Sequence, residues 1–423
     1  MLCHKLITLS ISCILRSSKL HNNVIVSFTK RDLWCSSIMH LPESIRNIKH
    51  LGVKKINKNK ISPALSKYLE NINPTFRKKI IKDYTSLNLK HINPYLINNE
   101  ISNEFAALIK DDLLENMSYI IELNPGYGLL TRKLLEANVP FIHLYECRTE
   151  FYLELQRLEK IFPDRFSISD TDLQNISRML NLKATSHVFN NPNKYICELF
   201  TNVPKRNWEE KSCMQIIGIV IRFSFIRHLI LSVIFQTGFM MHGRAIFYLA
   251  LSPTIWNKLM HHSKKGLITH IMFRTLFNYT VFGTLDRKGF LPWQNIKKSN
   301  ITENQFFYVV KLEPKPNLLS LFGEKEGVIY FWHFIRQYYH RPTLRLIPSL
   351  EKIIPGFGMR LIEKNYNIFT EFGELNTNQI IDIYMELKSW PGFKESAFLP
   401  SANIIRKIYD PHVNMQENEV NQL

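Results

Sequence analysis

The chain has few cysteines, and none of them is arranged for a metal site or a disulfide framework. Its 423 residues include six cysteines. No two of these form a Cys-x-x-Cys pair, and none has histidines at zinc-finger spacing. The sequence therefore predicts no metal site, and it indicates a reducing compartment rather than a disulfide-stabilised secreted domain. The six are Cys3, Cys13, Cys35, Cys147, Cys197 and Cys213.

Acidic residues are also scarce, above all near the N-terminus. The sequence has 36 acidic residues against 54 lysines and arginines, which gives a net charge of +18. Such an excess favours a polyanionic partner, nucleic acid above all. The first acid is Asp32, and residues 1–40 mix basic residues with serines and apolar residues. This pattern favours a mitochondrial presequence over residues 1–40 rather than a secretory signal, with a disordered basic N-terminus as the alternative.

No Asp or Glu occurs between Arg46 and Lys67, and a second basic cluster follows shortly after. Such runs are mobile when free and can become ordered against phosphates. We therefore predict a flexible basic arm over residues 41–88 that binds nucleic acid; a solvated tail without a role is the alternative. The candidate contact residues are Arg46, Lys49, Lys54, Lys55, Lys58, Lys60, Arg77, Lys78 and Lys79.

The longest apolar stretch, residues 214–241, is not free of charge. Arg222, Arg227 and His228 interrupt it near the middle, where a charge is costly in lipid. We therefore predict a helix packed against a sheet here, and no membrane partner.

A glycine-rich turn stands between an apolar run and a helical pattern. The run 119–121 ends at Glu122, the turn contains Asn124, Gly126 and Gly128, and a helical segment follows. Glycines let a backbone approach a ligand closely, and the helix N-terminus offers unpaired N–H groups. The acid would repel a pyrophosphate but suits an amino acid moiety, which favours S-adenosylmethionine. A tight turn in any α/β domain is the alternative.

Two further expected strands each lead to an acid. Residues 141–146 end at Glu146, about 20 residues beyond the turn, where a carboxylate accepts hydrogen bonds from ribose hydroxyls. Residues 165–169 lead to Asp172, which can accept from an adenine amino group. This order, a strand with a glycine turn and a helix followed by two strands that each lead to an acid, predicts an α/β fold with a Rossmann-like sheet.

The rest of the chain indicates a second, smaller domain. A strand is expected at 244–251, and two late strands at 279–285 and 306–312 suggest a closing hairpin. The proline-rich link 313–316 then marks a boundary. We predict a methyltransferase-like domain over 89–313, a helical domain over 317–405, and a disordered tail over 406–423.

Residues 122–131, Glu-Leu-Asn-Pro-Gly-Tyr-Gly-Leu-Leu-Thr, resemble the first motif of the ribosomal RNA adenine N6-dimethyltransferases. Tyr95 and Leu96 lie in a segment similar to the one with which that family holds the methionine of S-adenosylmethionine. The mitochondrial branch, the transcription factor B proteins and especially their second-factor subfamily, is the most similar. The resemblance covers about residues 85–395 and implies a Rossmann-like methyltransferase sheet with a smaller helical domain. Its implied cofactor residues are Tyr95, Leu96, Glu122, Asn124, Gly126, Gly128, Glu146 and Asp172.

The fourth motif departs from the family pattern. Active members carry Asn-Leu-Pro followed by an aromatic residue, which holds the target amine and stacks on the flipped adenine. We match Asn202, Pro204 and Lys205 to this motif. Asn202 could still accept the amine, but Lys205 cannot stack, and a lost base stack costs about 1–3 kcal/mol. The resemblance then implies weak or lost methyl transfer.

Three functions remain open on these residues. The first is a monomeric transcription initiation factor in the mitochondrial matrix (nucleoid), working with the mitochondrial RNA polymerase to melt promoter DNA and hold the opened strand. The second is an active S-adenosylmethionine-dependent dimethyltransferase of adenines in the small mitochondrial rRNA. The third is an RNA-binding assembly factor with neither activity.

Overall fold

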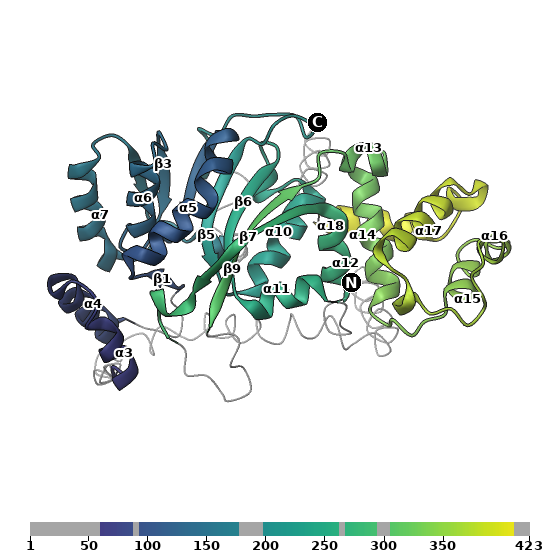
Figure 1. The fold of residues 1–423 in the computed structure, drawn as a ribbon. Helices are drawn as coiled ribbons and strands as arrows, with labels where there is room; N and C mark the ends of the chain where they lie inside the picture. The colour runs from purple at the N-terminus through teal and green to yellow at the C-terminus, as the bar shows by residue number, and fades with distance from the viewer. Residues whose placement is uncertain (1–59, 88–92, 177–197, 262–266, 294–304, 410–423) are drawn as a thin grey trace, which may run out of the picture. The chain divides into compact units, whose positions relative to one another are not determined.

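The computed structural model describes residues 60–87, 93–176, 198–261, 267–293 and 305–409. A seven-stranded sheet has the strand order β4-β3-β2-β5-β6-β9-β7 (Figure 1). The first five strands are mutually parallel, and β9 runs antiparallel to both of its neighbours. The predicted α/β fold and the closing β7–β9 pair are confirmed. The bounds are β2 Tyr119–Leu123, β3 Ile142–Tyr145, β4 Phe166–Ser169, β5 Met214–Val220, β6 Ala245–Leu251, β7 Phe277–Asp286 and β9 Phe306–Pro314.

Both faces of this sheet are covered, which explains why its central strands are apolar throughout. Every residue of β5 and β6 is buried. Alternate residues belong to different cores: Ile217 and Tyr248 pack in one hydrophobic cluster, while Ile216 and Phe247 pack in another. A period of two with apolar residues on both sides is typical of a buried parallel strand. The covering helices are α5 Asn99–Glu115, α6 Leu129–Glu136, α7 Thr149–Ile161, α10 Phe223–Phe235, α11 Pro253–Met260 and α12 Leu267–Leu276.

The prediction of a single helix over 214–241 is wrong. The segment begins as strand β5, turns at Ile221 and Arg222, and only then forms α10 and the short helix η4, Gly238–Met240. Gly218 lets β5 lie close to β2, because a Cβ at this position would lie 3.0 Å from Cβ of Leu123 on that neighbouring strand. The window Phe223–Met240 is long and apolar enough to cross a membrane, and 61% of it is buried inside the fold.

The predicted flexible arm is partly helical. Within residues 41–88 the structure has α3, Pro63–Leu69, and α4, Pro74–Ser86. Each helix begins with proline in its first turn after a side-chain cap, Ser62 or Asn73, which suits a helix start. Apolar residues of both helices pack in one cluster with residues of the glycine turn. The segment 63–86 is therefore a folded part of the protein.

The C-terminal region is helical, as expected. In α14 the residues Phe331, Phe334, Ile335 and Tyr338 are buried, which confirms that this face belongs to the core. The helix shares one hydrophobic cluster with α10 and α12. The predicted boundary at 313–316 therefore falls between segments that share a core, and it stays a prediction. The helices are α13 Leu318–Phe322, α14 Lys325–Tyr339, α15 Leu346–Glu351, α16 Phe357–Glu363, α17 Thr377–Ser389 and α18 Phe398–Tyr409.

Candidate functional site

The glycine turn after β2 is held in a left-handed backbone conformation. Asn124, Gly126 and Gly128 have φ angles of 52°, 62° and 72°. At Gly126 a Cβ would lie 2.8 Å from Cβ of Tyr95, so only glycine fits against that ring. Tyr95 is fixed by the short strand β1, Tyr95–Leu96, which pairs with β8, Phe290–Leu291. The turn and the tyrosine thus form one packed unit.

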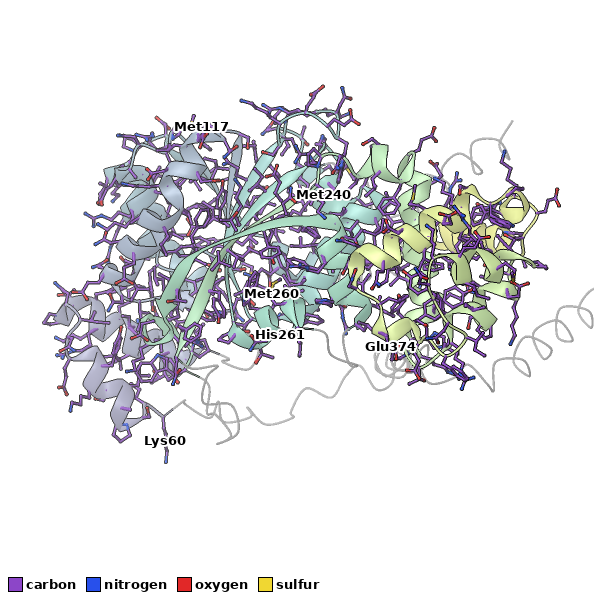
Figure 2. All side chains as sticks on the ribbon, turned by 45° about the vertical axis from the view of Figure 1, so that its right-hand side comes forward. Lys60, Met117, Met240, Met260, His261 and Glu374 are labelled. Atoms are coloured by element: carbon purple, nitrogen blue, oxygen red, sulfur yellow. The ribbon has the colours of Figure 1, made fainter. Side chains whose placement is uncertain are left out.

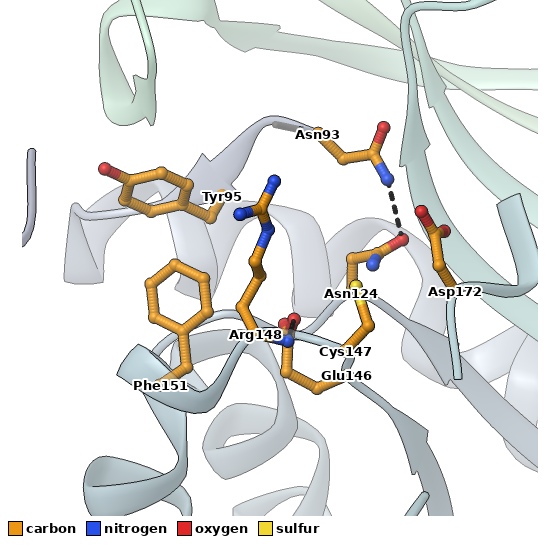
Figure 3. Close-up of a pocket in the computed structure, with 8 residues that line it drawn as sticks. All are labelled: Asn93, Tyr95, Asn124, Glu146, Cys147, Arg148, Phe151 and Asp172. Atoms are coloured by element: carbon orange, nitrogen blue, oxygen red, sulfur yellow. Dashed lines mark hydrogen bonds between the residues drawn. The ribbon is translucent and has the colours of Figure 1, made fainter. Parts of the chain in front are cut away.

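A small cleft opens beside this turn, at the carboxyl ends of β2, β3 and β4. Figure 3 shows its lining, with Asn93 and Tyr95 on one side and the turn after β3 below. Four predicted cofactor residues line it together: Tyr95, Asn124, Glu146 and Asp172. The remaining lining residues are Asn93, Cys147, Arg148 and Phe151.

Glu146 ties the cleft to the glycine turn. One carboxylate oxygen accepts from the Gly126 N–H at 3.0 Å, and the other accepts from the Arg148 N–H at 2.9 Å. The side chain is buried, and burial raises the pKa of Glu146 to about 7, with nearby Asp172 adding to the rise. A buried carboxylate facing a cleft is suited to accept hydrogen bonds from hydroxyl groups of a ligand.

Glu122 has a different place from the one predicted. Its carboxylate accepts from the Thr131 hydroxyl at 2.6 Å and does not line the cleft. It is fully enclosed, and burial raises the pKa of Glu122 to about 7. Its role is to hold the first turn of α6 against β2. Leu96 does not line the cleft either. It is buried in the hydrophobic cluster that contains the apolar residues of α5.

Asp172 connects the cleft to the segment that follows β5. It accepts from the Gln174 N–H at 3.1 Å and from the Asn175 side-chain amide. The Asn175 oxygen in turn accepts from Arg222 at 2.8 Å. Arg222 directly follows β5, so the carboxyl ends of β4 and β5 are joined through three side chains.

The predicted fourth motif lies elsewhere. Asn202, Pro204 and Lys205 precede β5, are exposed and do not line the cleft. The N–H of Arg206, the next residue, donates to the His242 carbonyl, three residues before β6 begins. That is the amino edge of the sheet, about 20 Å from the carboxyl edge for a seven-residue strand.

A clamp for a target base has to stand at the carboxyl edge, where ligands of such sheets bind. At that edge the residues after β5 are Ile221, Arg222 and Phe223. The assignment of the motif to Asn202, Pro204 and Lys205 stays a prediction, and these residues do not line the cleft. Neither an amide nor a proline is among the three residues that follow β5.

Asn93 and Arg148 are site residues that the motif reading missed. The Asn93 amide donates to the Asn124 side-chain oxygen at 3.1 Å, and its own side-chain oxygen is buried and has no hydrogen-bond partner among the described residues. Arg148 extends into the space between Tyr95 and Asn124 (Figure 3). A signal for both was present, since Asn93 stands two residues before Tyr95 and Arg148 two residues after Glu146.

The lining fits a ligand with an adenosyl and an amino acid part. Glu146 and Asp172 are acceptors for hydroxyl or amino groups, Asn93 has an unused buried acceptor, and Tyr95 and Phe151 supply aromatic surface. The volume free in this structure is about 20 Å³, far below the roughly 300 Å³ at the lower limit of ligand pockets, so a ligand of this size would require the lining to open. In the described part of the chain, no three His, Cys, Asp or Glu side chains are placed to hold a metal ion.

The predicted nucleic-acid residues differ in their surroundings. Lys60 and Lys78 are exposed and Arg77 is partly so (Figure 2 labels Lys60). Lys79 faces carboxylates instead, with Asp83 at 3.4 Å and Glu154 at 3.9 Å. It therefore helps to fix α4 to α7. Arg46, Lys49, Lys54, Lys55 and Lys58 lie outside the described residues.

Comparison with known proteins found one curated relative and several solved structures that are similar to this chain. No protein-family model matches it. A mitochondrial dimethyladenosine transferase 2 from Drosophila melanogaster is 28% identical over 333 residues, which cover 67% of this chain and 72% of that protein. A solved dimethyladenosine transferase from Plasmodium falciparum is 12% identical, covers 69% of this chain and 97% of its own, and has a TM-score of 0.44. A 23S rRNA methyltransferase matches at 12% identity over 70% of this chain and 100% of its own, with a TM-score of 0.37.

Proposed function

We propose that this chain, which is related to the mitochondrial rRNA adenine dimethyltransferases, is a mitochondrial transcription initiation factor with weak or lost methyl transfer. It would work with the single-subunit mitochondrial RNA polymerase to melt promoter DNA and hold the opened strand. Mitochondrial localisation, in the matrix nucleoid, is part of the proposal and is supported by the mitochondrial relative.

The observation that carries the proposal is the contrast along one edge of the sheet. The cleft after β2, β3 and β4 keeps the acids and aromatic rings of a cofactor site. The segment after β5, where the target adenine would be clamped, offers Ile221, Arg222 and Phe223. Adenine N6 is a poor nucleophile that needs an aligned acceptor and a ring stacked on the base. An arginine supplies no acceptor, so this arrangement favours strand binding over methyl transfer.

S-adenosylmethionine remains a candidate ligand of the cleft, where it would supply an activated methyl group. Glu146 and Asp172 would orient its adenosine part. Arg148 would pair with the carboxylate of its methionine part, next to Asn93. In this proposal the ligand stabilises the fold and is not consumed.

The proposal is tested by promoter-dependent transcription with purified polymerase. The intact chain should stimulate run-off transcription, and removal of residues 46–59, which stops before α3, should lower it by reducing attraction to DNA. Glu146→Gln, made to weaken cofactor binding, should leave stimulation unchanged with or without S-adenosylmethionine. A purified chain that never stimulates the polymerase would rule the function out.

The second candidate is an active dimethyltransferase of the small mitochondrial rRNA. The chemistry of the cleft favours it, because its acids suit the cofactor. Methyl transfer to an adenine-containing RNA hairpin is the matching assay. Transfer by the intact chain that Glu146→Gln abolishes would establish the enzyme, whereas no transfer above background is expected here.

A further inference from the structure

Phe223 directly follows Arg222 and is the first residue of α10, and its ring makes cation–π contacts with two side chains. The Arg227 guanidinium lies 5.1 Å from the ring centroid, and the Lys258 ammonium lies 5.3 Å from it. Arg227 is in the second turn of α10, and Lys258 is in α11, which follows the neighbouring strand β6. The helices that follow the adjacent strands β5 and β6 thus each place one positive charge against the ring of Phe223.

Neither of these two cations is neutralised. Arg227 and Lys258 are exposed, and among the described residues no carboxylate lies within 4.0 Å of either. This differs from Lys79 and Arg244, which pair with Asp83 and Glu313. Two like charges on one ring repel each other, and a cation–π contact relieves this only in part. An anion bound between them would remove the repulsion.

The cluster of Phe223, Arg227 and Lys258 stands on the same edge as the cleft. Arg222 precedes it directly and reaches Asp172 through Asn175, as described above. A nucleic-acid strand lying over the end of β5 would therefore contact the cluster next to the cleft. Figure 2 labels Met260 and His261, which end the helix that carries Lys258.

We propose that Arg227 and Lys258, positioned by Phe223, form a binding site for the phosphodiester backbone of a single-stranded nucleic acid. The site would occupy the place of a base clamp and would read no sequence, because phosphate contacts carry none. This inference rests on the proposed strand-holding function, and it names the residues that would do the holding.

The test is binding of the full chain to a fluorescent oligothymidylate, measured by anisotropy over a range of salt concentrations without polymerase. Arg227→Gln/Lys258→Gln should weaken binding about 10- to 30-fold at ~0.1 M salt and reduce the salt slope by about 1.4, the value for two phosphate contacts on a single strand. Phe223→Leu keeps both charges, so it should weaken binding only about two- to fivefold with the slope unchanged.

The matched control is Lys160→Gln/Lys211→Gln, which removes two exposed lysines from α7 and from the amino edge of the sheet. It changes the net charge equally, so equal losses in the two double variants would overturn the site. If circular dichroism shows that Arg227→Gln/Lys258→Gln does not fold, the single variants Arg227→Gln and Lys258→Gln are each compared with Lys160→Gln instead.

An oligouridylate of equal length distinguishes the source of the strand. Equal losses on DNA and RNA support backbone contacts to either, and a loss confined to RNA supports the site with an RNA strand as its ligand. Because no polymerase is present, a chain that binds through this cluster but fails to stimulate transcription would keep the site and remove only the initiation-factor function.

Discussion

The carboxyl edge of the sheet has two halves that differ in chemistry. After β2, β3 and β4 the chain supplies buried carboxylates, amides and aromatic rings around an enclosed cleft. After β5 and β6 it supplies Arg227 and Lys258 around a half-buried Phe223. The first half suits a small polar ligand, and the second suits an extended anion. In the proposed function, the first half would hold a cofactor and the second half would hold a nucleic-acid strand.

The largest effect is expected in the glycine turn of the first half. Gly126→Ala adds a Cβ 2.8 Å from Cβ of Tyr95 at a φ of 62°, so it should cost about 2–5 kcal/mol through strain and overlap. Gly356→Ala is the control, since its φ is 89° but no atom lies within 4 Å of the added Cβ, and it should cost only about 1–2 kcal/mol. Denaturant unfolding measures both.

Gly126→Ala also tests whether the two halves bind their ligands independently. A Gly126→Ala chain that still folds at low temperature should lose ligand binding in the cleft but keep oligonucleotide binding, because the cluster around Phe223 includes no residue of the turn. Parallel loss of both activities would mean that the halves are one site, and the comparison would fail.

Glu122 gives the first half a dependence of its stability on pH. Its pKa is raised to about 7 by burial, so between about pH 4.5 and 7 the folded chain binds more protons than the unfolded chain. This stabilisation is fully present below about pH 4.5 and is lost as the pH rises through 7. Glu122→Gln keeps the acceptor for Thr131 and should raise stability at pH 7 by up to about 3 kcal/mol.

The measurement is the free energy of unfolding across that pH range. Glu136→Gln serves as the control, because Glu136 is exposed and paired with Arg132 and Lys133, which lower its pKa. A slope between pH 4.5 and 7 that is the same in the intact chain and in Glu122→Gln would show that the buried carboxyl is not the source.

A buried hydrogen bond joins the N-terminal helices to the first half, in addition to apolar packing and the contacts of Lys79. Tyr127, within the glycine turn, donates to Asp83 of α4 at 3.0 Å. Tyr127→Phe leaves Asp83 with Lys79 alone and should cost about 1–2 kcal/mol. Amide hydrogen exchange in α4 should rise as well. Tyr330→Phe, which removes an exposed hydrogen bond to Asn403, should change neither.

Local motifs were sufficient to predict the first half, and the second half needed the fold. The turn and the acids at 146 and 172 follow their strands directly in sequence, so their spacing located them. The strand 214–220 was hidden because a fully buried strand and a buried helix have the same apolar composition. Without the end of this strand, the sequence does not indicate that residues 221–223 stand at the carboxyl edge. Asn93 and Arg148 lie two residues from Tyr95 and Glu146 in sequence, but only the packing shows that they line the cleft.

The smallest expected effect is the sharpest test of where the base clamp stands. If Lys205 were its lost aromatic residue, Lys205→Tyr should restore stacking and raise methyl transfer to an adenine hairpin, because a stack is worth about 1–3 kcal/mol, or roughly 5- to 150-fold. The structure places Lys205 beside His242 at the amino edge, so no change beyond about twofold is expected. Lys211→Tyr is the control, since it adds the same ring at the same edge. A gain specific to Lys205→Tyr would return the clamp to the 202–205 segment and break the contrast between the two halves.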